Sequence, residues 1–276
     1  MLPVLNSGGV RPAKLIVDLD DGEHKVRLRK RAGGYGLLAR TSELLQVPGI
    51  VMAERRAVHW SCYAIVCSEL DRAHLHHFGF GRKMEVITNA LQLPGRQPGL
   101  SSGPAVLFLG ACSYLPNHEA AERLALRIWP LIRARVPGAT LILAGQDTDC
   151  LPSRAGARPI PGFVPDLAAL HAETRVVCCP LLRGSGTRLK LVEAAAFARP
   201  NVSTCLGAEG LDFTDGADIL LRESDADIAV SCAALLQDEA ACLRLGNAGR
   251  ATMATLYDVA MVERQIASFM EAILHA

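Results

Sequence analysis

The sequence lacks the features that mark several large classes of protein. No apolar run reaches the roughly 20 residues needed to span a bilayer, and the first residues show no signal-peptide pattern. No GxxxxGK[ST] motif is present, which excludes a Walker phosphate loop. The formal net charge is only +1, and no block of Lys and Arg is long enough for a nucleic-acid-binding arm. We therefore expect a soluble protein with no nucleic-acid partner.

The cysteines give no sign of disulfides or of a metal site. Their number, nine, is odd, and several lie in apolar, strand-like runs (Cys67, Cys178, Cys179 and Cys205). A free cysteine in such a run behaves as a small buried hydrophobe, which favours a reducing, cytoplasmic setting. No CxxC pair occurs, and Cys62 and Cys67 have no second ligand pair at zinc spacing. We expect neither a bound metal nor a cofactor.

Two polar stretches in the first part of the chain leave alternatives open. The run 25-KVRLRKR-31 fits either a solvated helix face or a surface that contacts anionic lipid. The stretch 74-HLHH-77 places His74 and His77 one helical turn apart. That spacing fits either the polar end of a surface helix or a pair of metal ligands.

Short apolar runs alternate with longer helical patterns from residue 14 onward. The runs are near-continuous rather than alternating, as in parallel strands that are covered on both faces. Strand and helix in succession predict an α/β fold with doubly wound parallel sheets. The strands are expected at residues 14–19, 64–68, 84–88, 105–110, 140–145, 175–181, 201–205 and 218–222.

A segment rich in proline and glycine, 90-ALQLPGRQPGLSSGP-104, divides the chain. It predicts a partial N-terminal domain over residues 1–95 and a complete C-terminal domain over 96–276, with the last helix able to pack back on the first domain. The N-terminal part offers only three strands, and half a domain of this type leaves a sheet edge unpaired. The sequence reads as though it starts within a domain.

The stretch 180-PLLRGSGTRLKLVEAAAFARP-200 predicts a strand end, a glycine turn and a helix that runs to Ala198. Arg188 and Lys190 lie in the first turn of that helix, where the helix dipole favours negative charge. Two cations there make sense if they bind an anion together with the free backbone N–H groups. The alternative is that both are solvated and that Lys190 pairs with Glu193. The turn lacks the third glycine of a dinucleotide fingerprint, which argues against NAD.

Several segments together resemble the donor-binding domain of family 4 retaining glycosyltransferases, and the exopolysaccharide-type sugar transferases most of all. They are 106-VLFLGACSYLPNHEAAERLALRIWPLIRARVPGATLILAG-145, 160-IPGFVPDLAALHAETRVVCCPLLRGSGTRLKLVEAAAFARPNVSTCLGAEGL-211 and 257-YD-258. The resemblance covers nearly all of residues 104–260. It implies the GT-B architecture, in which two Rossmann-like domains face each other across a cleft. The segments 18-DLDDGEHK-25, 66-VCSELDRAHL-75 and 86-VITNAL-91 resemble the latter part of the family's N-terminal domain more loosely.

The resemblance assigns donor-binding roles to individual residues. It implies that Glu193 holds the ribose and that the backbone of Phe163 and Val164 reads the base. The others face the diphosphate and the sugar, Gly110 from across the cleft. The residues so assigned are Gly110, Phe163, Val164, Gly186, Thr187, Arg188, Lys190 and Glu193.

The chain departs from the family pattern at two places. The first Glu of the family's Glu–seven residues–Glu motif falls on Ser185, which we interpret as a donor-binding residue of a subfamily with a GSGTRLK-type sequence. The first strands of the N-terminal domain and its glycine-rich acceptor-side loop have no counterpart. The resemblance therefore implies a longer full-length relative, and a truncated gene product fits this pattern.

Four further polar residues follow strands or begin helices. Asp20 and Asp21 follow the first strand, where carboxylates either cap a helix or, in the case of Asp21, face an acceptor. Glu209 lies in another loop after a strand, and we expect it near the donor. Asn117 follows Pro116 at the start of a long helix, where we expect it to act as the N-cap.

The resemblance implies transfer of a sugar from a nucleoside diphosphate sugar to an acceptor hydroxyl with retention of configuration. Arg188 and Lys190 would stabilise the leaving diphosphate without a metal. The acceptor would be a glycan or a lipid-linked glycan, with peripheral contact at the inner face of the membrane as an open alternative. Two rival functions are a non-catalytic nucleotide-sugar binder and an epimerase of GT-B fold. The epimerase would need acidic and histidine residues from N-terminal segments that are missing here.

Overall fold

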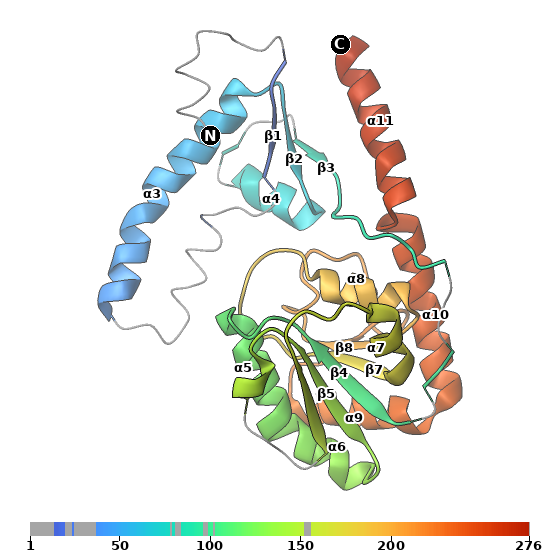
Figure 1. Cartoon of the computed structure of the whole chain (residues 1–276). Coiled ribbons are helices and arrows are strands. Elements are labelled where there is room, and N and C mark those ends of the chain that lie inside the picture. Colours follow the sequence, from blue (N-terminus) through green and yellow to red (C-terminus); the bar gives the residue numbers. More distant parts are fainter. Residues whose placement is uncertain are drawn as a thin grey trace. The chain divides into compact units, whose positions relative to one another are not determined.

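The computed structural model describes residues 14–19, 24, 37–77, 79–80, 84–95, 99–101, 103–151 and 156–275, with side chains from residue 44 onward in the third range. The basic run 25–31 and the two carboxylates Asp20 and Asp21 lie outside these residues. The contacts divide the chain into two units, which are Met1–Thr88 with Gly184–Gly186 and Asn89–Arg183 with Thr187–Ala276 (Figure 1).

The first unit contains a small parallel sheet in the order β1-β2-β3. Its strands are β1 (Ile16–Asp18), β2 (Tyr63–Val66) and β3 (Met84–Val86), which confirms the three strands predicted there. Two helices accompany them, α3 (Leu37–Trp60) and α4 (Glu69–His77). The core of this unit is small and consists of Val58, Ala64, Val66, Leu75, Phe80 and Met84.

The histidines of α4 end a helix that is largely exposed. His76 and His77 are exposed, whereas the half-buried His74 lies 3.0 Å from the ring nitrogen of the buried His24. The other ring nitrogen of His24 lies 2.5 Å from a carboxylate oxygen of Glu54. No group of three or more His, Cys, Asp or Glu side chains suited to a metal occurs in the part of the chain that the structure describes.

The second unit is built on a parallel sheet in the order β6-β5-β4-β7-β8-β9. The chain order reverses between β4 and β7, which is the switch point of a doubly wound sheet. The strands predicted for this part all appear. The bounds are β4 (Ala105–Leu109), β5 (Thr140–Gly145), β6 (Ala157–Pro161), β7 (Val176–Cys179), β8 (Asn201–Ser203) and β9 (Leu220–Leu221).

Strand β6 was missing from the sequence-based prediction. It carries Pro159 and Pro161, and proline cannot donate a hydrogen bond to a neighbouring strand. The structure places β6 at the edge of the sheet, beside β5 only, where one side of the strand needs no partner. The two prolines therefore mark an edge strand rather than a loop.

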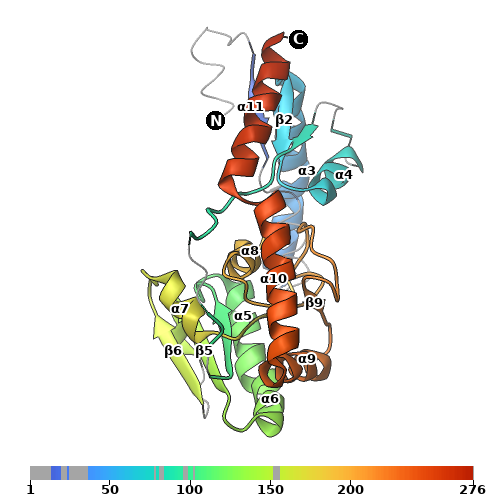
Figure 2. The ribbon, with the colours of Figure 1, turned by 90° about the vertical axis from the view of Figure 1, so that its right-hand side faces the viewer.

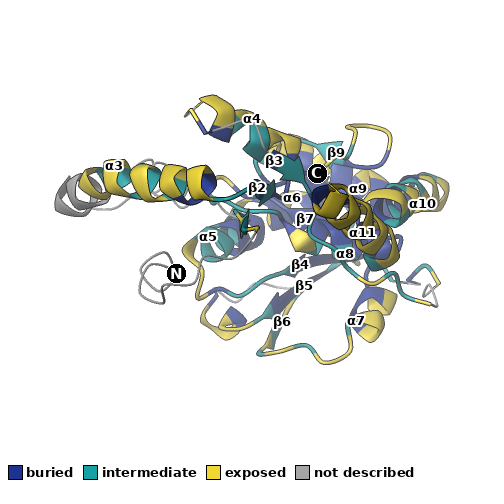
Figure 3. Cartoon of the chain, turned by 90° about the horizontal axis from the view of Figure 1, so that it is seen from above, coloured by how far each residue is buried: buried dark blue, intermediate teal, exposed yellow. Residues whose placement is uncertain are grey.

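Helices cover both faces of this sheet. One face carries α5 (Leu115–Arg123), α6 (Trp129–Arg135) and α9 (Asp225–Gln237), and the other carries α7 (Leu167–Glu173) and α8 (Leu189–Ala196). Helix α10 (Glu239–Leu256) packs beside α8 and α9, and α11 (Val259–His275) follows it (Figure 2). The central strands β4, β5, β7 and β8 are largely buried, whereas α10 and α11 keep an exposed outer face (Figure 3). A short 3-10 turn, η2 (Thr148–Cys150), follows β5.

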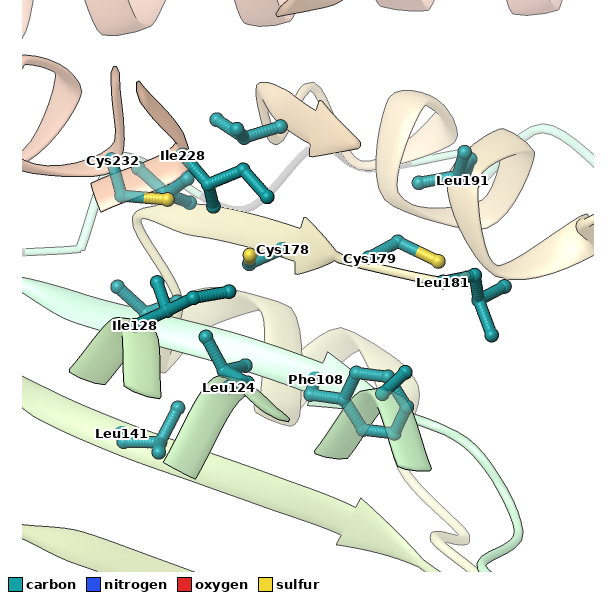
Figure 4. Close-up of a cluster of buried hydrophobic side chains, with 14 of the residues drawn as sticks. Phe108, Leu124, Ile128, Leu141, Cys178, Cys179, Leu181, Leu191, Ile228 and Cys232 are labelled. Atoms are coloured by element: carbon teal, nitrogen blue, oxygen red, sulfur yellow. The ribbon is translucent and has the colours of Figure 1, made fainter. Parts of the chain in front are cut away.

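The larger core lies between the sheet and the layer of α5, α6 and α9. Phe108 and Leu141 from the strands meet Leu124 and Ile128, and all four side chains are fully buried (Figure 4). The thiols of Cys178 and Cys232 belong to the same cluster, as expected of free cysteines that behave as small hydrophobes. Leu124 and Ile128 belong to a π-helical turn, η1 (Leu124–Ile128), that joins α5 to α6.

Two expectations about helix ends were wrong. Asn117 does not cap α5, because the helix begins at Leu115 with Tyr114 at the N-cap and a proline in the first turn. Helix α8 ends at Ala196 rather than at Ala198. Ala198 has a φ of 53°, a left-handed conformation that a continuing helix cannot contain.

A buried arginine fixes the end of strand β7. Arg123 of α5 is 8% exposed and donates hydrogen bonds to the carbonyls of Pro180 and Glu223 at 3.0 and 2.7 Å. It also forms an ion pair with Asp225 at 2.7 Å. A buried cation with all these partners ties α5 to two strand ends.

The motif Tyr257–Asp258 holds the segment that follows the first unit. The backbone N–H of Leu91 donates to the Tyr257 carbonyl at 2.9 Å, and the N–H of Leu93 donates to Asp258 Oδ1 at 3.0 Å. The Tyr257 hydroxyl accepts from the N–H of Asp212 at 2.7 Å, and burial raises its pKa to about 12. Among the described helices, none is long and apolar enough to cross a membrane.

Candidate functional site

A pocket of about 650 Å³ opens in the second unit where β4, β5 and β6 end. Ligands of open parallel sheets bind beyond the carboxyl ends of the strands, and this volume suits a ligand of nucleotide size. Four residues assigned to the donor from sequence lie in its wall: Gly110, Phe163, Val164 and Glu193. The complete lining is Leu109, Gly110, Ala111, Gly145, Gln146, Gly162, Phe163, Val164, Leu167 and Glu193.

Gly110 and Gly145, which lie side by side in space, form the wall at the ends of β4 and β5. Gly145 has a φ of 129°, and a Cβ atom there would lie 2.3 Å from the carbonyl oxygen of Gly110. Only a residue without a side chain fits this conformation and this spacing. The two backbones therefore lie directly against each other and leave polar backbone groups at the pocket.

The ammonium of Lys190 lies against the same wall. A Cβ atom on Gly110 would come within 2.6 Å of Lys190 Nζ. That nitrogen donates to Asn117 Oδ1 at 2.7 Å and lies 4.7 Å from the centre of the Phe108 ring. The Asn117 amide is itself oriented, because its nitrogen donates to the Ala111 carbonyl at 3.0 Å. Asn117 thus positions a cation, a role that its sequence context did not reveal.

Burial lowers the pKa of Lys190 below its usual value of 10.5. The nearby thiol of Cys179 opposes this shift and the guanidinium of Arg188 reinforces it. A desolvated ammonium gains free energy when an anion arrives. The site therefore holds a cation whose hydrogen bond, to Asn117, is to a neutral group and leaves its charge uncompensated there.

Arg188 is buried as well, with 7% of its surface exposed, and it is the N-cap residue of α8. The alternative of two solvated cations is therefore wrong for Arg188. The expected pair of Lys190 with Glu193 does not form either. Lys190 donates a hydrogen bond to Asn117, and Glu193 bonds a histidine. Both cations lie at the start of α8, Arg188 as the N-cap residue and Lys190 in the first turn.

Glu193 receives a hydrogen bond from a residue that the sequence analysis missed. The Nε2 atom of His171, in α7, lies 3.2 Å from Glu193 Oε1. The histidine side chain is 1% exposed, whereas that of Glu193 is 20% exposed and lines the pocket. In the sequence His171 follows four apolar helix residues, 167-LAAL-170, and no local signal marks it as a functional residue.

The remaining predicted residues lie elsewhere or outside the described chain. Ser185, Gly186 and Thr187 form the half-buried connection from β7 to α8, and Gly186 has the positive φ, 83°, expected of a glycine turn. Glu209 lies in a turn after β8 and is not among the described residues that line the pocket. Asp21 lies outside the described residues.

Comparison with known proteins identifies the domain that carries the pocket. Residues 103–238, just under half of the chain, match the family model described as "Glycosyl transferases group 1". No curated protein matches the chain by sequence.

Solved structures of glycosyltransferases resemble the chain in fold. A variant of TarM from S. aureus, in complex with fondaparinux, α-GlcNAc-glycerol and UDP, matches with a TM-score of 0.75 and 13% identity, over 97% of this chain and 52% of TarM. Sucrose-phosphate synthase from Thermosynechococcus elongatus matches with a TM-score of 0.72 and 17% identity, over 94% of this chain and 68% of the synthase. Anabaena HepE, in complex with UDP and glucose, matches with a TM-score of 0.69 and 16% identity, over 94% and 71%.

These likenesses establish the fold that the sequence predicted. The chain is α/β with parallel, Rossmann-like sheets, and its first unit is a partial N-terminal domain of the GT-B type. The chain spans about half the length of TarM. Residues 103–238 match the group 1 glycosyl transferase model, and the chain has the GT-B fold.

Proposed function

We propose that the protein transfers a sugar from a nucleoside diphosphate sugar to an acceptor hydroxyl with retention of configuration. We place it among the family 4, exopolysaccharide-type enzymes of polysaccharide or glycan biosynthesis. The observation that carries this proposal is the pocket at the ends of β4, β5 and β6, with the Lys190 ammonium at one wall and the Glu193 carboxylate at another. A cation and a carboxylate at one pocket suit a ligand that has both phosphate and hydroxyl groups.

The cations would act on the leaving group. In the transfer, the bond from the sugar C1 to a diphosphate oxygen breaks, and a bond from the acceptor oxygen to C1 forms as the hydroxyl proton is released. Negative charge develops on the diphosphate. Arg188, Lys190 and the N–H groups at the start of α8 are preorganised to stabilise it. In this proposal the two cations take the place of a metal.

The opposite end of the pocket would bind the nucleoside. Phe163 is 91% exposed although it lines the pocket, so its ring is free to contact a base. Val164 presents backbone groups beside it, and Glu193 would accept hydrogen bonds from the ribose. HepE in complex with UDP-glucose, a structure of similar fold, supports a nucleotide sugar as the donor.

The acceptor we propose is a glycan, either free or linked to a lipid. TarM in complex with α-GlcNAc-glycerol supports an acceptor of sugar chemistry. Asp21 would face the acceptor, and the basic run 25–31 would hold the protein at the inner, cytoplasmic face of the membrane. Failure to sediment with anionic liposomes at low salt would contradict the membrane contact.

A second candidate function is nucleotide-sugar binding without turnover. The observation that favours it is the place of the pocket, because all its lining residues belong to the part of the chain that matches the family model. The donor pocket lies entirely in the second unit. Binding alone therefore needs only residues of that unit, whereas transfer needs an acceptor site as well.

A thermal-shift titration with UDP, GDP, ADP and their sugar conjugates tests both candidates. A ligand at a hundred times its Kd adds about 2.7 kcal/mol, which raises the midpoint by several degrees. We expect one nucleotide series to shift the wild type and the double variant Arg188→Ala, Lys190→Ala to lose the shift. Release of nucleoside diphosphate from the matching sugar conjugate then separates an enzyme from a binder. No shift with any of them would overturn both proposals.

A further inference from the structure

Behind the Glu193 carboxylate lies a histidine that faces no solvent. His171 is near the end of α7, and its side chain is 1% exposed. Its ring stacks on that of Phe197, with centroids 4.5 Å apart and an interplanar angle of 18°. Its Nε2 atom lies 3.2 Å from Glu193 Oε1. The imidazole is therefore fixed by packing on one side and by one hydrogen bond at its edge.

The environment of the second ring nitrogen defines the protonation state. Nδ1 of His171 is buried and has no hydrogen-bond partner among the described residues. An imidazolium would place a second N–H donor there, buried and unpaired, which is unfavourable. A neutral ring with its proton on Nε2 satisfies the single donor by the bond to Glu193. We therefore assign the Nε2–H tautomer, in which the ring donates its single proton to Glu193 Oε1.

We propose that His171 is a positioning residue, which holds Glu193 so that the site requires the ribose hydroxyls of the nucleotide. The inference rests on the proposed function, because it assumes that a nucleotide fills this pocket. The bond to Oε1 fixes the plane of the carboxylate and leaves Oε2 for ligand hydroxyl groups. A carboxylate fixed before binding loses less rotamer freedom when the ligand arrives. A vicinal diol supplies two donors, as an ionised acceptor-only group requires.

A packing role alone would explain the burial of His171 but not its bond to a pocket carboxylate. Two substitutions separate the roles. His171→Phe keeps an aromatic ring to stack on Phe197 and removes the donor. His171→Gln loses the ring and places an amide N–H near the position of Nε2.

The test measures Kd by calorimetry for the nucleoside diphosphate that binds the wild type and for its 2′,3′-dideoxy analogue. We expect His171→Phe to weaken the ribonucleotide about tenfold, which is about 1.4 kcal/mol, and to leave the dideoxy analogue within about twofold. His171→Gln should recover most of the ribonucleotide affinity. Glu193→Ala should show the same loss as His171→Phe, and the double variant should lose no more than either alone.

Three outcomes would overturn the proposal. One is an unchanged ribonucleotide Kd in His171→Phe, and another is an equal loss for the dideoxy analogue, which indicates general packing. If His171→Phe does not fold, His171→Met, which also lacks a donor, takes its place under the same criteria. If the wild type binds no nucleotide, the proposed function itself fails and this inference falls with it. That result differs from the first two, in which the wild type binds.

Discussion

The two walls of the pocket in the second unit differ in what they are made of. The wall at the ends of β4 and β5 consists of backbone. Gly110 and Gly145 lie so close that a methyl group on Gly145 would collide with the main chain of Gly110. The wall from α8 is the side chain of Glu193, and the Lys190 ammonium lies next to Gly110. Each of these two side chains is held by a single residue from another helix. The backbone of the sheet determines the first wall, whereas the second wall depends on individual side chains of α8.

This difference predicts where changes will act. A side chain at Gly145 must move the main chain of Gly110 at the end of a central strand, so it should cost stability. A substitution in the side-chain wall leaves the strands in place, so it should cost ligand affinity. The variants below test this division, beginning with the largest expected effect.

Gly145→Ala should break the backbone wall. The φ of 129° is strained for any residue with a Cβ atom, and that atom would lie 2.3 Å from the Gly110 carbonyl. We expect a loss of about 3 kcal/mol or more in the free energy of unfolding, measured by urea denaturation.

Gly138→Ala is the matched control, since no atom lies within 4 Å of a Cβ atom at that turn position. Its unfolding midpoint should stay within the error of the wild type. Equal midpoints for Gly145→Ala and Gly138→Ala would refute the idea of a rigid backbone wall.

Gly110→Ala should affect ligand binding rather than stability, because the new methyl group meets a side chain instead of main chain. The nearest atom would be Lys190 Nζ at 2.6 Å, the end of a flexible side chain that can move away. We expect little change in stability and about a tenfold loss of nucleotide affinity, or about 1.4 kcal/mol, in a calorimetric titration.

The second variant Lys190→Met tells whether that loss acts through the ammonium. If it does, Gly110→Ala should add little to the loss already caused by Lys190→Met. Fully additive losses would show that Gly110 contacts the ligand in its own right.

Nucleotide affinity should fall at high pH, and Lys190 should be the reason. Burial lowers the pKa of this lysine below 10.5, so the ammonium loses its proton earlier than an unfolded lysine does. As the pH rises through that lowered value, the cation disappears and we expect diphosphate binding to weaken several-fold. Titrations at about pH 7 and about pH 9.5, below the usual lysine pKa, would measure this change.

The same group should affect stability in the opposite direction. Below the lowered pKa the folded protein bears the cost of a buried ammonium, and above it that cost is relieved. The free energy of unfolding should therefore rise with pH in wild type relative to Lys190→Met. A Lys190→Met protein whose affinity falls with pH as steeply as that of the wild type would assign the titration to another group.

Phe163→Ala should have the smallest effect. The side chain is 91% exposed, so its removal should leave the unfolding midpoint unchanged. Loss of a stacking surface for the base should raise Kd about fivefold, at the low end of the stacking energies of bases on aromatic rings. An unchanged Kd would remove Phe163 from the proposed base site.

The sequence predicted the fold well because parallel strands have a strong local signal. Continuous apolar runs such as AVLFL and TLILAG became β4 and β5, since strands covered on both faces have no polar positions. Strand β6 escaped because Pro159 and Pro161 argue against a strand unless its place at the edge is known. That place is a property of the whole sheet.

Four residues of the candidate site were predicted from the family resemblance rather than from a strand signal. Gly110, Phe163, Val164 and Glu193 belong to motifs, and the structure gathers all four around one pocket. His171 and Asn117 were missed as positioning residues because their partners lie 22 and 73 positions away in the sequence. Only the packing of α7 and α5 near α8 gives these two side chains their roles.

The alkylation rates of the buried thiols in the second unit can report local opening of its core. Burial raises the pKa of Cys112 and of Cys242 to about 11, and a thiol alkylates only as its thiolate. Cys150 and Cys205 are exposed. The hydrogen bond with Glu223 raises the pKa of Cys205, so mass spectrometry after brief alkylation should find the first label at Cys150 and the next at Cys205. Each label that appears later, at a buried cysteine, would report a transient opening of the core around that residue.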